Sequence, residues 1–111
     1  MKKHNDPRQL AIALLSRSIC SIAVSAVLAD SYGVHAWGWN SSGLTGYGEH
    51  AEAHCLRRAN RSRLSGSTMY IASRRARNGK MLNSRPCMEC QKLIRCVGSI
   101  VYLDKSGWRM M

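Results

Sequence analysis

The sequence lacks long apolar runs, internal repeats and a paired set of cysteines. No apolar run reaches the roughly 18–20 residues that a membrane span needs, which argues against a membrane protein. The absence of repeats and low-complexity segments excludes fibrous and collagen-like architectures. The cysteine count of 5 is odd, so the cysteines do not form a closed disulfide framework. We therefore expect free thiols in a reducing compartment and a cytoplasmic location.

Acidic residues are also scarce. The chain has 6 Asp and Glu against 17 Lys and Arg, which gives a net charge of +11. No acid lies between Glu52 and Glu89, and the Lys and Arg of this interval occupy residues 57–85. Such a stretch attracts phosphate, either on a nucleotide or on a nucleic acid. A solubilising surface explains the charges equally well, so both interpretations stay open.

The chain length of 111 residues suits one domain, which we place at residues 1–111. Pro7 and the apolar residues that follow it predict an amphipathic helix over residues 7–18. The alternative for this segment is a secretory signal that begins at Lys2 and Lys3, but Arg17 interrupts its apolar stretch. We therefore favour the helix.

The rest of the sequence predicts four strands and two more helices. Strand-forming residues are concentrated at residues 22–28, 34–39, 68–72 and 100–103. A glycine- and serine-rich loop at residues 40–48 follows the second of these strands. Helices are predicted near residues 50–60 and from Pro86 onward. The order α-β-β-α-β-α-β indicates an α/β fold. The last two strands should be parallel, because a helix connects them.

Two short motifs stand at the starts of the last two predicted helices. The first is His50-Ala51-Glu52, and the second is Pro86-Cys87-Met88-Glu89-Cys90. Cysteines three residues apart share one side of a helix, and the free N–H groups of its first turn favour thiolates. Two thiolates and the His50 imidazole give Zn²⁺ three protein ligands. A fourth tetrahedral position remains for water, as catalytic zinc requires.

Glu52 stands two residues from the predicted ligand His50. Zinc lowers the pKa of bound water to about 7, and a neighbouring carboxylate can then move protons between that water and a substrate. The alternative is a closed structural site in which Cys55, Cys96 or His54 supplies a fourth ligand. Otherwise we expect Cys20, Cys55 and Cys96 to be core thiols, since free cysteine is commonly buried.

The pattern H-x-E followed by P-C-x-x-C is typical of zinc-dependent deaminases. On these residues the chain resembles the cytidine and deoxycytidylate deaminase superfamily, over roughly residues 7–104. The resemblance implies a three-layer α-β-α sandwich around a mixed sheet, to which we assign about four strands. Members commonly continue with one more helix and strand. We therefore expect a C-terminally truncated sheet, whose exposed edge homo-oligomerisation would cover.

The resemblance also implies an activity, namely conversion of a cytosine-type base to uracil in a free nucleoside or nucleotide. Glu52 would be catalytic, and the metal ligands would be His50, Cys87 and Cys90. The strand that ends at Asn40 resembles the family's second strand, which makes Asn40 a candidate substrate contact. The backbone carbonyl of Arg85 stands where the family accepts a hydrogen bond from the substrate's amino group.

Two alternatives to a free nucleotide substrate stay open. One is a deaminase of single-stranded DNA or RNA that binds through the basic stretch 57–85, with Trp37 and Trp39 either stacking on bases or packing in the core. The other is a non-catalytic, zinc-stabilised module that binds nucleic acid. The run from His50 to His54 is also similar to the pyrimidine deaminase of riboflavin synthesis. That enzyme has a longer insertion between its two cysteines, so the cytosine-type branch is the closer match.

Overall fold

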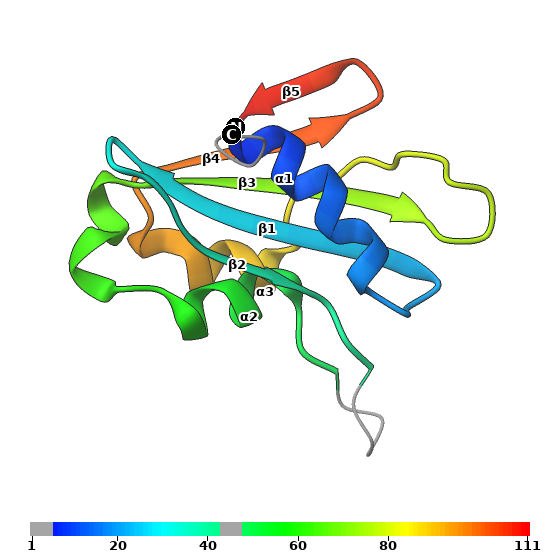
Figure 1. The fold of residues 1–111 in the computed structure, drawn as a ribbon, viewed down its shortest axis with the longest axis horizontal. Coiled ribbons are helices and arrows are strands. Elements are labelled where there is room, and N and C mark those ends of the chain that lie inside the picture. The colour runs from blue at the N-terminus through cyan, green and yellow to red at the C-terminus, as the bar shows by residue number, and fades with distance from the viewer. Residues whose placement is uncertain (1–5, 43–47) are drawn as a thin grey trace.

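The computed structural model describes residues 6–42 and 48–111 (Figure 1). Lys2 and Lys3, where the alternative signal would begin, lie outside these ranges, as does the middle of the predicted loop at residues 40–48. One mixed sheet has the strand order β2-β1-β3-β4-β5. Its strands are β1 (Ile22–Asp30), β2 (Gly33–Trp39), β3 (Thr68–Arg75), β4 (Ser99–Asp104) and β5 (Gly107–Met110). The α-helices are α1 (Pro7–Leu14), α2 (Ala51–Arg58) and α3 (Met88–Leu93).

Three 3₁₀ segments continue from or follow these helices. They are η2 (Leu15–Arg17), η3 (Arg61–Gly66) and η4 (Ile94–Cys96). Strand β1 pairs antiparallel with both β2 and β3, whereas β3 and β4 are parallel. The predicted parallel pair is therefore confirmed, and α3 lies in its crossover connection. Within the described residues no helix is long and apolar enough to cross a membrane.

The prediction of about four strands was wrong, because the sheet has five. Strand β5 folds back antiparallel on β4 through a tight turn, with no helix between the two strands. The turn uses Gly107 at φ +121°, and the Asp104 side chain accepts a hydrogen bond from the Ser106 N–H at 2.7 Å. Trp108 stands opposite Leu103 and packs edge-on against Tyr70, with ring centroids 6.2 Å apart. The outer strand at this side is therefore β5 and not β4.

Helices cover both faces of the sheet, which confirms the three-layer α-β-α arrangement. Helix α1 lies on one face, and α2 and α3 lie on the other (Figure 1). Asp6 caps α1 by accepting a hydrogen bond from the Arg8 N–H at 3.0 Å, and Pro7 occupies the first turn as predicted. A smaller apolar cluster, including Leu14, Leu15, Val27 and Leu103, joins α1 to the sheet.

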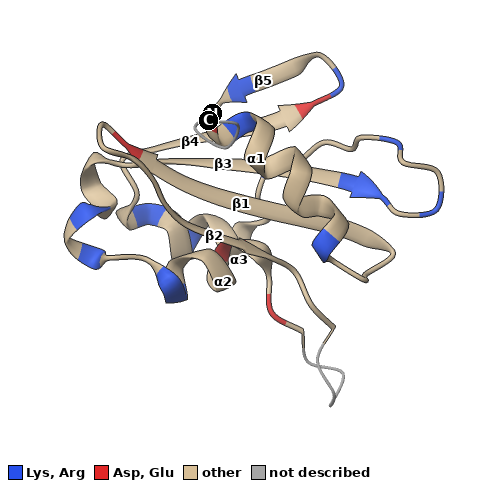
Figure 2. Cartoon of the chain, viewed as in Figure 1, with Lys and Arg blue, Asp and Glu red and all other residues tan. Residues whose placement is uncertain are grey.

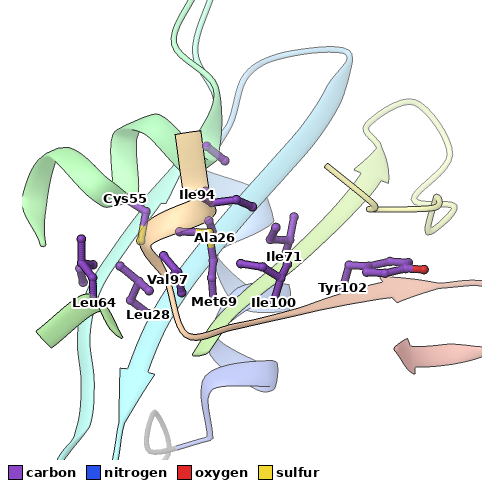
Figure 3. Packing of buried hydrophobic residues seen from close by; sticks show 12 residues of the cluster. Ala26, Leu28, Cys55, Leu64, Met69, Ile71, Ile94, Val97, Ile100 and Tyr102 are labelled. Carbon is purple, nitrogen blue, oxygen red and sulfur yellow. The ribbon is translucent and has the colours of Figure 1, made fainter. Parts of the chain in front are cut away.

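The larger apolar cluster fills the space between the sheet and the layer of α2 and α3 (Figure 3). Its fully buried members include Leu28, Met69, Ile71 and Cys55. Helix α2 approaches β2 very closely at Gly38, where an added Cβ would lie 2.6 Å from the Cys55 backbone nitrogen. Because Gly38 has no side chain, α2, which carries one of the two motifs, can pack directly against the backbone of β2.

The predicted core thiols divide into three environments. Cys55 is buried as predicted, Cys20 is half-buried, and Cys96 is exposed, so the prediction for Cys96 was wrong. Cys96 ends the short segment η4, whose apolar residue Ile94 turns toward the sheet while the thiol faces outward. A segment this short has only one buried side, and the residue types alone do not determine which side chain occupies it.

Candidate metal centre

Both motifs begin helices in the structure. His50 is the N-cap of α2 and Cys87 is the N-cap of α3, and neither side chain forms a capping hydrogen bond with its own helix. Helix α3 begins at Met88, so Pro86 precedes the N-cap and does not lie in the first turn as predicted. Because an N-cap side chain ordinarily satisfies the helix N–H groups, these two are free to bind another group.

The His50, Cys87 and Cys90 side chains converge on one point. Their ligand atoms all lie within 4.8 Å of one another, and His50 Nδ1 is 3.0 Å from Cys90 Sγ. Among the described residues, no further His, Cys, Asp or Glu joins this group. His54 does not turn toward it, since its Nδ1 bonds to the backbone of Trp39 instead. A set of one imidazole and two sulfurs fits Zn²⁺.

Glu52 lies in the first turn of α2 and lines the same cavity as the three metal-binding candidates. Only 4% of Glu52 and 4% of Cys90 is exposed, whereas His50 and Cys87 are open to solvent. Burial raises the pKa of the Cys90 thiol, and the neighbouring Glu52 carboxylate raises this pKa further. A divalent cation has the opposite effect, because its charge stabilises the thiolate. A bound cation would therefore have to displace the proton of Cys90.

The cavity beside this cluster has a volume of about 300 Å³. Ile22 and Val24 of β1 contribute apolar lining, and Arg85 is also among the lining residues. The implied role of the Arg85 carbonyl in substrate binding stays a prediction. The Arg85 guanidinium is 5.9 Å from the centroid of the Tyr102 ring. The structure also shows a buried pair in the wall that the sequence did not indicate. The hydroxyls of Ser73 and Ser84 are 2.9 Å apart, and neither serine belongs to a recognisable motif.

Asn40 follows β2 and lines a smaller cavity of about 130 Å³ together with His50 and Glu52. Its side chain is already engaged with the protein. Oδ1 accepts hydrogen bonds from Ser18 Oγ at 2.7 Å and from the Val24 N–H at 2.9 Å. Its Nδ2 donates to the Ile22 carbonyl at 2.9 Å. Asn40 therefore has a structural role in the fold. Its implied role in substrate binding stays a prediction.

The basic stretch at residues 57–85 does not form one patch. One group of cations lies at the end of α2 and on η3, and a second group lies at the end of β3 and on the turn that follows (Figure 2). Two cations of the first group are paired: Arg57 with Glu49 at 2.9 Å and Arg63 with Asp30 at 2.7 Å. Of the Lys and Arg residues in this stretch, only Arg85 lines the 300 Å³ cavity.

Three candidate ligands beside a cavity, with a buried acid on the same cavity, fit the class of zinc sites that keep one position open for chemistry. The family model described as the cytidine and deoxycytidylate deaminase zinc-binding region matches residues 1–103. The chain therefore belongs to the cytidine and deoxycytidylate deaminase family. No curated protein sequence matches it.

Solved structures show the same fold. Cytidine deaminase from Burkholderia pseudomallei superimposes with a TM-score of 0.72 at 18% identity, covering 100% of this chain and 92% of that one. Cytidine deaminase from Mycobacterium leprae gives 0.63 at 19% identity, covering 93% and 88% of the two chains. The enzyme from Mycobacterium tuberculosis gives 0.63 at 19% identity, covering 99% and 91%. The cytidine-deaminase-like fold that the sequence predicted is confirmed.

Proposed function

We propose that the protein is a hydrolytic deaminase that converts a cytosine-type base to uracil in a free nucleoside or nucleotide. Water adds to C4 of the ring, the bond from C4 to the amino nitrogen breaks, and ammonia leaves. The observation that carries this proposal is the convergence of His50, Cys87 and Cys90 within 4.8 Å, with the buried carboxylate of Glu52 on the same cavity.

In this proposal His50, Cys87 and Cys90 hold Zn²⁺. When bound, the ion acts as a Lewis acid and makes water ionise near neutral pH. Glu52 accepts the proton that the water loses and passes it to ring nitrogen N3. Glu52 then takes the remaining proton from the hydroxyl on C4 and delivers it to the departing amino nitrogen, so that the C4 carbonyl forms as ammonia leaves. The burial of Glu52 supports this role, because a carboxylate shielded from solvent exchanges protons with the substrate rather than with bulk water.

The cavity supports a small substrate. Ile22 and Val24 provide an apolar wall suited to one face of a pyrimidine ring, and we propose that the Arg85 carbonyl accepts a hydrogen bond from the amino group. Among the residues that the structure describes, Arg85 is the one Lys or Arg that lines the cavity, which favours a substrate with one phosphate or none over a polymer held there. The likeness in fold to cytidine deaminases supports the same choice. A cytoplasmic location and a homo-oligomeric state stay predictions.

Zinc-loaded wild type and Glu52→Gln should be compared on cytidine, CMP and dCMP, with ammonia release and bound zinc both measured. We expect Glu52→Gln to keep stoichiometric zinc and to lose about 10²–10⁴-fold in rate, the usual contribution of a general acid–base. Cys87→Ser should instead lose the metal. Glu89→Gln is the matched control, because Glu89 is an exposed acid in the first turn of α3 and should keep its rate. Full turnover by Glu52→Gln would refute the mechanism.

A further inference from the structure

A second and larger hollow lies across the sheet from the metal centre, between α1 and the edge strand β2. Its volume is about 500 Å³, and we call it the β2 groove. Helix α1 and the η2 segment form one wall, and the turn before β2 and the strand itself form the other. The residues that carry the argument are Leu10, Ala13, Arg17, Tyr32, Val34 and Trp37.

Two aromatic side chains of the β2 groove are unusually exposed. Tyr32 is 91% exposed and Trp37 is 41% exposed, although both side chains are large rings. The apolar core packs against Trp39 but leaves Trp37 outside, so packing accounts for only one of the two tryptophans. Tyr32 lies in the turn before β2 and Trp37 lies on β2, and exposed rings of this kind are a surface on which planar groups stack.

Two arginines lie against the tryptophan rings of β2. Arg58 is 6.0 Å from the Trp37 ring centroid and 5.4 Å from that of Trp39, and it donates a hydrogen bond to the Trp37 carbonyl at 3.2 Å. Arg17 lies 5.6 Å from the Trp39 centroid on the side of α1. Neither arginine forms an ion pair with any described carboxylate. Arg58 therefore borders the exposed ring of Trp37, and Arg17 lines the β2 groove beside the half-buried ring of Trp39.

We propose that the β2 groove binds single-stranded nucleic acid. Unpaired bases can stack on Trp37 and Tyr32, whereas Arg17 and Arg58 meet the phosphates, and the excess of cations over acids attracts the polymer. Strand β2 is 7 residues long, which spans about 23 Å and accommodates several nucleotides. A duplex fits less well, because its bases are stacked on one another and cannot reach the rings.

This binding uses neither the metal centre nor Glu52, so it does not rest on the proposed function. The test is a titration of zinc-loaded protein with fluorescently labelled oligothymidylate of about 12 nucleotides, a length within the range of single-strand sites. Thymine lacks the amino group that a deaminase removes. Glu52→Gln should bind this probe as the wild type does, so loss of probe binding and loss of cytidine turnover are separate results.

We expect Trp37→Ala to weaken probe binding about 5- to 100-fold, the loss that follows removal of one stacked base. Tyr32→Ala should also weaken it, and this substitution at an exposed turn leaves the core untouched. Arg17→Ala and Arg58→Ala should each reduce the slope of log affinity against log salt by about 0.7. The matched control is Arg95→Ala, which removes the same charge from an exposed site on the layer of α2 and α3. It should leave the slope and affinity nearly unchanged.

Four outcomes would overturn the proposal. Trp37→Ala and Tyr32→Ala could bind the probe as tightly as Arg95→Ala does. A duplex of the same length could bind more tightly than the single strand. Free thymidine monophosphate could displace the probe at equal concentration, which would show a mononucleotide site. Finally, Trp37→Ala could change the oligomeric state in sedimentation without changing probe binding, which would show that a second copy of the chain covers β2.

Discussion

Replacing Asn40 by alanine separates the two roles that this residue can have. Its side chain makes three hydrogen bonds, to Ser18 Oγ, the Val24 N–H and the Ile22 carbonyl. These bonds tie the end of β2 to the segment before β1 and to the start of β1. Asn40→Ala removes all three and leaves the Ile22 carbonyl and the Val24 N–H without this partner. We therefore expect the variant to be less stable whatever its effect on substrate binding.

The size of the loss follows from the hydrogen bonds. Each contributes a net of about 0.5–1.5 kcal/mol, so three account for about 2–4 kcal/mol of the free energy of unfolding. In a domain of this size that corresponds to a fall in Tm of about 10–20 °C. Urea and thermal unfolding of the zinc-loaded protein, followed by circular dichroism, measure both quantities. The KM for cytidine can be determined on the same samples below the unfolding transition.

The matched control is Asn78→Ala. Asn78 lies in an exposed turn, and its side chain accepts a single hydrogen bond from the Lys80 N–H at 3.0 Å. This variant should lose about 1 kcal/mol or less. If Asn40→Ala unfolded at the same temperature as Asn78→Ala, the structural role argued here would be refuted. A rise in KM without a fall in Tm would show that Asn40 acts on the substrate alone.

Three further substitutions or reactions test the fold. Gly38→Ala should cost about 1–3 kcal/mol in urea unfolding, because its Cβ would meet the Cys55 nitrogen at 2.6 Å; unchanged stability would contradict the close approach. Burial raises the pKa of Cys55 to about 12, so iodoacetamide at about pH 9 should modify Cys96 and spare Cys55, as peptide mass spectrometry would show; early modification of Cys55 would be the opposite result. The hydrogen bond from Arg63 lowers the pKa of Asp30 to about 2, below its unfolded value of about 3.9. The stabilisation is therefore present above about pH 4 and is lost as the pH falls to about 2, and Asp30→Asn should flatten that part of the stability profile. A profile equal to that of the wild type would show that the ion pair does not contribute.

The grouping of His50, Cys87 and Cys90 was predictable because each motif determines locally where its side chains lie. A helix start fixes where its first side chains lie, and the cysteine spacing keeps two sulfurs on one side of a turn. The crossover between the parallel strands β3 and β4 then places α3 on the same face of the sheet as α2 (Figure 1), so that the two helix starts can lie close together. The spacing of residues within each motif therefore predicted the arrangement of the site, even though the two motifs are far apart along the chain.

Other features depended on contacts that no local pattern records. The hydrogen bonds of Asn40 and the pairing of Ser73 with Ser84 join segments that only the folded sheet brings together. Strand β5 was missed because it is only 4 residues long and alternates too little to show a period. The turn before it did contain a usable sign, since Asp104-Lys105-Ser106-Gly107 precedes Trp108, a composition typical of hairpins.

The two uncapped helix starts have a consequence for how the molecule folds. Helices α2 and α3 contain 8 and 6 residues, lengths at which an isolated helix is unstable in water. Their N-cap side chains, His50 and Cys87, make no capping hydrogen bond to their own helices and can bind one metal ion together instead. A bound metal ion would therefore link the start of α2 to the start of α3 and stabilise both helices. We expect removal of the metal to lower the amount of folded protein as well as its activity.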